Sequence, residues 1–159
     1  HDVSMILALA GGLPHAVTAG AAATVDGRTI DTLHAALAFD DDLRASLAAS
    51  WIHPYKEQRL VVAGSEGIAV FDDLQPGTRK LTVQRQRLDA GELVLREEAE
   101  PLHWEVAEPL ALECAHFLDC VREGRTPRSD AAEALDVVRV LAACEQAARA
   151  HQRSDPRTF

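Results

Sequence analysis

Histidine is the residue type in this chain with the widest chemistry near neutral pH, and seven histidines occur. His1 stands directly before an apolar helical run, where its imidazole could face a cleft and act as a general acid or base. The alternative is a frayed terminal residue without a role. The histidines show neither an i, i+4 pair nor a Cys/His knuckle, so we expect no bound metal.

Motifs for nucleophilic or phosphate chemistry are absent from the sequence. There is no G-x-S-x-G elbow and no Walker A loop, and Gly64-Ser65-Glu66-Gly67 lies between two strand-like runs instead of opening a helix. The acidic run 40–42 lacks the spaced oxygen ligands of a calcium loop, and we interpret it as a solvated hairpin tip. Neither segment is predicted to bind a phosphate or a cation.

Composition narrows the class of protein. The 159 residues suffice for one domain with a substantial core, and a net charge of −9 without a basic cluster argues against nucleic acid as a partner. The longest apolar run is too short to cross a bilayer, so we expect no membrane partner. Three cysteines without metal-ligand spacing favour reduced thiols and a cytoplasmic location.

Helical and extended segments alternate in a way that predicts a mixed fold. Helical patterns cover residues 1–10, 109–124 and a segment that begins after Asp130, which resembles a capping box with Glu133. Period-two or β-branched patterns predict strands near residues 14–25, 30–39, 44–51, 59–64, 68–72, 79–88 and 92–97. We expect the three strands between Arg44 and Asp73 to form a meander, with Pro54 as a break.

Two helices close the chain, and each is predicted to bury one apolar face. The first stripe consists of Leu110, Cys114, Phe117, Leu118 and Val121, and the second of Ala131, Leu135, Val138, Leu141 and Ala142. Alanine is a poor strand former, yet it is abundant between residues 35 and 49. This small-residue face predicts close approach of another layer, either a helix or a second sheet from a partner subunit.

Several segments together resemble a known family. They are H-D-V-S-M-I-L-A-L-A-G-G-L-P (1–14), A-S-W-I-H-P-Y-K-E-Q-R-L-V-V-A-G-S-E-G-I-A-V-F-D-D-L (49–74) and E-P-L-A-L-E-C-A-H-F-L-D-C-V-R-E-G-R-T-P-R-S-D (108–130). The chain resembles the C-terminal domain of the Gfo/Idh/MocA oxidoreductases, and looks most like the nucleotide-sugar branch of the UDP-N-acetylglucosamine 3-dehydrogenase type.

The resemblance implies an α+β fold with an open, largely antiparallel sheet, helices on one face and subunit contacts on the other. Residues 1–150 would form the substrate-binding and oligomerisation domain, followed by a flexible tail at 151–159. Family members carry an N-terminal Rossmann domain that binds NAD or NADP. Since the chain begins at His1 without such a domain, we expect it to be a fragment that is inactive alone and binds no cofactor.

The resemblance also implies site residues. His1 matches the histidine that serves as general acid/base on a sugar hydroxyl, and Ser4 stands where many members have an aspartate. His53, Tyr55 and Lys56 are candidates for the substrate cleft or a subunit contact. Trp51 is a further candidate, although we expect it to be a core residue.

The leading hypothesis is thus the C-terminal half of an NAD(P)-dependent dehydrogenase that oxidises a sugar or nucleotide sugar. Its expected partners are the Rossmann domain, the substrate and further copies of itself, as a dimer or tetramer through the sheet. The alternative is a non-catalytic homo-oligomeric or ligand-binding module.

Overall fold

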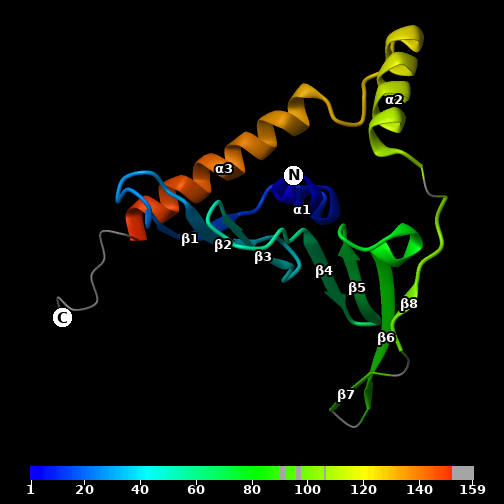
Figure 1. The fold of residues 1–159 in the computed structure, drawn as a ribbon, viewed down its shortest axis with the longest axis horizontal. Coiled ribbons are helices and arrows are strands. Elements are labelled where there is room, and N and C mark those ends of the chain that lie inside the picture. The colour runs from blue at the N-terminus through cyan, green and yellow to red at the C-terminus, as the bar shows by residue number, and fades with distance from the viewer. Residues whose placement is uncertain (90–91, 96–97, 106, 152–159) are drawn as a thin grey trace. The chain divides into compact units, whose positions relative to one another are not determined.

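The computed structural model describes residues 1–89, 92–95, 98–105 and 107–151 (Figure 1). The chain divides into two compact units, the first made of residues 1–54 together with the chain from residue 126 on, and the second of residues 55–125. Residues 152–159, most of the expected tail, and residues 90 and 91 of the expected 89–91 turn lie outside the described residues.

The first unit is a three-stranded antiparallel sheet with two helices on one side. Its strands occur in the order β1-β2-β3, and Thr18, Ala36 and Ser46 are paired across all three. The elements are α1 (Asp2–Ala10), β1 (Ala16–Ala22), β2 (Thr32–Ala38), β3 (Arg44–Ser50) and α3 (Ala131–His151). Every strand expected before residue 51 is present, and so is the first helix.

Strand alternation decides which side chains enter the core. On β2, Ala35 and Leu37 are buried while His34 and Ala36 are exposed, as a period of two requires. Val3, Ile6, Leu7, Ala35, Leu37, Phe39, Val140 and Cys144 form one cluster from α1, the β2 segment and α3. Leu37 is only 1% exposed, so its burial contributes about 1.5–3 kcal/mol. Helices therefore cover the face that carries Ala35.

Asp31 closes the connection between β1 and β2. Its Oδ2 accepts hydrogen bonds from the N–H groups of Thr24 at 2.5 Å and Val25 at 2.8 Å, and its carbonyl accepts from Trp51 N at 2.9 Å. The hydrogen bond from the Val25 N–H is the main cause of a lowered pKa for this carboxyl, against a smaller opposing effect of burial. Asp31 thus anchors both the β1–β2 connection and the end of β3.

The second unit contains a sheet of short strands. The order is β4-β5-β6-β7, with β8 also paired to β6. The elements are β4 (Arg59–Gly64), β5 (Gly67–Asp72), η1 (Gly77–Lys80), β6 (Leu81–Asp89), β7 (Glu92–Leu95) and β8 (Glu100–Pro101). A Cβ on Gly67 would lie 2.6 Å from the carbonyl oxygen of Gln84, so the backbone approach of β5 to β6 requires glycine here.

The expected meander between Arg44 and Asp73 is wrong. β3 pairs with β2 in the first sheet, whereas β4 and β5 belong to the second. The acidic run 40–42 supports the β2–β3 hairpin because Asp41 and Asp42 adopt positive φ angles of 53° and 59°, which Asp tolerates better than most residues. The break predicted at Pro54 coincides with the boundary between the two units.

Helix α2 (Pro109–Glu123) begins and ends as predicted. The Glu108 side chain accepts from the N–H groups of Leu110 and Ala111, and Gly124 ends the helix with φ 64°. The buried stripe proposed for α2 is wrong, since Leu110 is 63% and Phe117 59% exposed.

The stripe proposed for α3 is also wrong. Leu135, Val138 and Leu141 are exposed, whereas Val140 and Cys144 are buried against the sheet. Both sets recur at helical spacing, and the smaller side chains pack on the alanine-rich strands. Of the three cysteines, none in a disulfide, Cys114 is exposed and Cys120 and Cys144 are buried.

Candidate functional site

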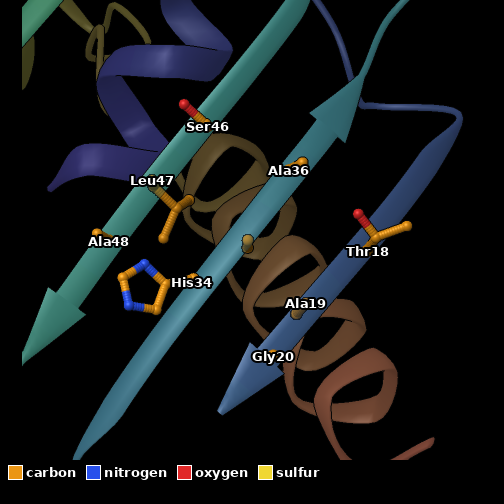
Figure 2. Close-up of a pocket in the computed structure, with 9 residues that line it drawn as sticks. Thr18, Ala19, Gly20, His34, Ala36, Ser46, Leu47 and Ala48 are labelled. Carbon is orange, nitrogen blue, oxygen red and sulfur yellow. The ribbon is translucent and has the colours of Figure 1, made fainter. Parts of the chain in front are cut away.

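The face of the first sheet that points away from α1 and α3 is hollowed. The hollow has a volume of about 590 Å³, and Figure 2 shows it with both helices behind the strands. The side chains on this face come from alternate positions of three paired strands, namely Thr18, Gly20, His34, Ala36, Ser46 and Ala48. Small residues dominate, so a flat partner can approach the backbone closely.

His34 is the one ionisable side chain that lines the hollow. It is paired with Gly20 on one side and Ala48 on the other, so its imidazole has no large neighbour in register. Thr18 and Ser46 add hydroxyl groups that can donate or accept hydrogen bonds. No Asp, Glu, Lys or Arg lines the hollow, although the whole chain carries a net charge of −9 and Arg44 lies at the edge of the same face, at the start of β3. Depletion of charge is typical of the centre of a protein interface.

His1 and Ser4 lie together at the start of α1. His1 is exposed at the N-cap position, and its carbonyl accepts from Met5 N at 3.0 Å. Ser4 is half-buried, and its Oγ donates to Oε1 of Glu133 at 2.7 Å. The imidazole of His1 is therefore accessible while the helix beneath it is tied to α3. The predicted roles of His1 and Ser4 stay predictions.

The other predicted residues follow β3. Trp51 is 83% exposed, so the expectation that it lies in the core is wrong. It comes directly after the last residue of β3, where its backbone is fixed by Asp31 and the inward positions of the strand have ended. His53 belongs to the first unit and is exposed.

Tyr55 and Lys56 belong to the second unit and are both exposed. Lys56 lies near Asp73, whose pKa is lowered by a hydrogen bond from Lys80 at 2.6 Å and further by the charge of Lys56. Arg59 similarly pairs with Asp72 at 3.0 Å and lowers its pKa. Asp72, the last residue of β5, and Asp73, which follows it, thus each form an ion pair within the second unit.

A histidine–cysteine pair on α2 was not predicted from the sequence. His116 and Cys120 are four residues apart on α2, and Nε2 lies 3.6 Å from Sγ of Cys120, which is 3% exposed. The i, i+4 spacing was the signal, and it applies to a Cys/His pair as well as to two histidines. No group of three metal-ligating side chains occurs among the described residues, so this pair is short of a structural zinc site.

The glycine segments near α1 and between β4 and β5 do not form a dinucleotide-binding loop. Gly11 follows α1 with φ 73°, and Gly64 and Gly67 flank a β4–β5 hairpin, so neither forms a loop that opens a helix. That no cofactor binds this chain stays a prediction. Within those residues, we find no helix of the length and apolar character that crossing a bilayer demands.

Two open antiparallel sheets, the first with α1 and α3 on one face, define an α+β domain. The comparisons agree. Residues 1–154 match the C-terminal alpha/beta domain of the oxidoreductase family GFO_IDH_MocA, and the chain belongs to that family. The resemblance seen in the sequence is thereby confirmed. A search of curated proteins gives no match.

Solved structures show the same fold. UDP-N-acetylglucosamine 3-dehydrogenase GnnA from Acidithiobacillus ferrooxidans has 23% identity and a TM-score of 0.76, covering 94% of this chain and 45% of that chain. An oxidoreductase from Magnetospirillum magnetotacticum MS-1 has 32% identity and a TM-score of 0.72, covering 91% and 46%. The WlbA dehydrogenase from Bordetella pertussis, in complex with NADH and UDP-GlcNAcA, has 20% identity and a TM-score of 0.65, covering 95% and 41%. This chain spans less than half of each.

Proposed function

We propose that this chain is the substrate-binding and oligomerisation domain of an NAD(P)-dependent dehydrogenase that oxidises a hydroxyl of a sugar or nucleotide sugar. Membership of the oxidoreductase family over residues 1–154 carries the proposal. The similarity to a UDP-N-acetylglucosamine 3-dehydrogenase and to WlbA supports a nucleotide sugar as the substrate class. NAD or NADP, bound by a separate Rossmann domain, would supply the hydride acceptor.

His1 is the proposed proton acceptor. Oxidation of an alcohol releases the hydroxyl proton as hydride leaves the carbon, and a neutral imidazole nitrogen can accept that proton near neutral pH. The side chain is exposed at the N-cap of α1, so a hydroxyl can reach it. His53, Tyr55 and Lys56 are proposed to contact the sugar or its nucleotide, since all three are exposed and two carry polar rings.

The test uses the full-length protein that includes the cofactor domain. We expect reduction of NAD or NADP when UDP-sugars are supplied, followed by the absorbance of the reduced nicotinamide, and weaker activity with free sugars. His1→Ala should lower kcat by about 10²–10⁴-fold, the usual contribution of general acid–base catalysis. His15→Ala is the matched control, because His15 is also exposed and lies outside α1. Full activity of His1→Ala would refute the assignment of His1.

The bare face of the first sheet is the proposed subunit contact. Its centre has no Asp, Glu, Lys or Arg, is lined by small side chains and extends over three strands, which suits the close packing of a second copy of the same face. Two copies of a chain with net charge −9 repel each other, so contact through an uncharged face costs least. The face also lies opposite α1, so assembly leaves His1 accessible.

The rival function is a non-catalytic assembly or ligand-binding module, favoured by the same uncharged hollow. It predicts self-association of the full-length protein without turnover of any sugar in the presence of NAD or NADP. Titration of the 159-residue chain with NADH provides a second distinction. We expect no saturable binding, because the described residues form no dinucleotide cradle.

A further inference from the structure

Glu133 makes a contact that its local sequence does not explain. Its backbone N–H donates to Asp130 Oδ1 at 2.9 Å, which is the first half of a capping box. The second half, in which the Asp130 N–H would donate to the Glu133 carboxylate, is not among the hydrogen bonds of the described residues. Instead Oε1 of Glu133 accepts from Ser4 Oγ at 2.7 Å, across 129 positions of sequence. The carboxylate therefore ties the first turn of α3 to the first turn of α1.

This contact falls at the end of α1 that carries His1. His1 is the N-cap residue of α1 and stands three positions before Ser4, so both belong to the start of the helix. Deeper in the helix, Ile6 and Leu7 are buried in the core. Val3 of the first turn is buried there too, so core packing restrains the whole of α1, and the Ser4–Glu133 hydrogen bond is a second, polar restraint on its first turn.

We propose that Glu133 is a positioning residue for His1, acting through Ser4 to hold the first turn of α1 and thereby the backbone from which the imidazole reaches the substrate hydroxyl. This inference rests on the proposed function of His1. A hydrogen bond to a carboxylate is stronger than one between neutral groups, and this one is half-buried, so it can hold a helix end. A displaced catalytic group lowers the rate of the chemical step more than the affinity for substrate.

The test compares Ser4→Ala, Glu133→Ala and the double variant in the full-length protein with its cofactor and a nucleotide sugar. Each single variant should lower kcat by about tenfold with KM changed by less than about twofold, since the groups act in the transition state. The double variant should lose no more than either single one, because both remove the same hydrogen bond. Ser4→Thr and Glu133→Gln keep a donor and an acceptor, and should restore most of kcat.

Glu145→Ala is the matched control, because Glu145 lies on the same helix but pairs with Arg149 at 2.6 Å on the exposed side. It should leave kcat unchanged. Unchanged kcat in Ser4→Ala and Glu133→Ala, additive losses in the double variant, or a rise in KM alone would each overturn the positioning role. The positioning role would also be overturned if the loss of kcat in each variant matched its loss of folded protein in thermal unfolding and Ser4→Thr did not restore kcat.

The two proposals fail separately. An active His1→Ala variant removes His1 from the reaction and the positioning role with it. If His1→Ala is inactive while Ser4→Ala and Glu133→Ala are fully active, only the positioning role is overturned. A full-length wild-type protein without dehydrogenase activity overturns both.

Discussion

A single charge on the bare sheet face tests the proposed subunit contact. Ala36 lies in the middle strand of the first sheet, paired with Thr18 on one side and Ser46 on the other, and its side chain points away from the core. Ala36→Glu places a carboxylate among small uncharged neighbours. In the free chain this carboxylate is solvated, so the fold should be little affected. In an assembly through this face it would be buried without a partner.

The expected loss follows from symmetry. A two-fold dimer contains the substitution twice, and an unpaired buried charge costs about 3 kcal/mol or more, so the two copies together cost about 6 kcal/mol. That corresponds to a dissociation constant raised by about ten-thousandfold. Sedimentation equilibrium over a series of concentrations should show the wild-type chain as a dimer or larger assembly and Ala36→Glu as a monomer.

Ala142→Glu is the control for net charge. Ala142 is an exposed residue of α3, on the opposite side of the sheet, so this variant carries the same charge as Ala36→Glu away from the bare face. It should assemble like the wild type. An Ala36→Glu chain with wild-type mass, or a wild-type chain that stays monomeric at every concentration, would refute the reasoning.

Three further predictions concern stability. Leu37→Ala should lower the free energy of unfolding by about 2–5 kcal/mol in urea denaturation, while Leu141→Ala, at a 52% exposed site, should lower it by less than about 1 kcal/mol. Because the folded pKa of Asp31 is lowered, its stabilisation is present above the unfolded pKa and is lost as pH falls through the folded pKa; Asp31→Asn should abolish this part of the pH dependence of the melting temperature. Asp130→Ala should cost about 0.5–2 kcal/mol through loss of the cap on Glu133 N, measured by the same denaturation.

Local chemistry made the element ends predictable. Pro109 and Gly124 bound α2 because proline lacks the N–H that a first turn leaves unpaired and glycine adopts φ 64° without strain. The hairpin between β4 and β5 was also predictable from the glycines that flank it, although neither Gly64 nor Gly67 has a positive φ and glycine is required only where Gly67 approaches Gln84. Each of these features is decided by a few adjacent residues, so a single sequence contains the necessary information.

The choice between two apolar stripes was not predictable in the same way. On α3, Leu135, Val138 and Leu141 have helical spacing, and so do Val137, Val140 and Cys144, which pack on the sheet. Helical spacing alone does not distinguish the two sets. The alanine-rich strands instead accept the smaller set, and this preference depends on the shape of a surface more than 80 positions away.

The residue types of the candidate site could be predicted from the sequence, but the contacts between those residues could not. The family resemblance pointed to His1 and Ser4, yet the partner of Ser4 is Glu133, and nothing local to either residue marks that pair. Glu133 was assigned to a capping box, which explains its backbone hydrogen bond and leaves its carboxylate unexplained. Trp51 was assigned to the core from its size, whereas its place after β3 leaves it exposed.

Strand alternation in the first sheet places the residues that support His1 on one face and those of the proposed subunit contact on the other. Ala35 and Leu37 point toward α1 and α3, and thus toward the support of His1, while His34 and Ala36 point into the hollow. A substitution on one set leaves the other set on its own side of the backbone. Ala36→Glu should therefore disrupt assembly while the Ser4–Glu133 hydrogen bond persists. Loss of dehydrogenase activity in a monomeric Ala36→Glu protein would then mean that the reaction itself requires the assembled form.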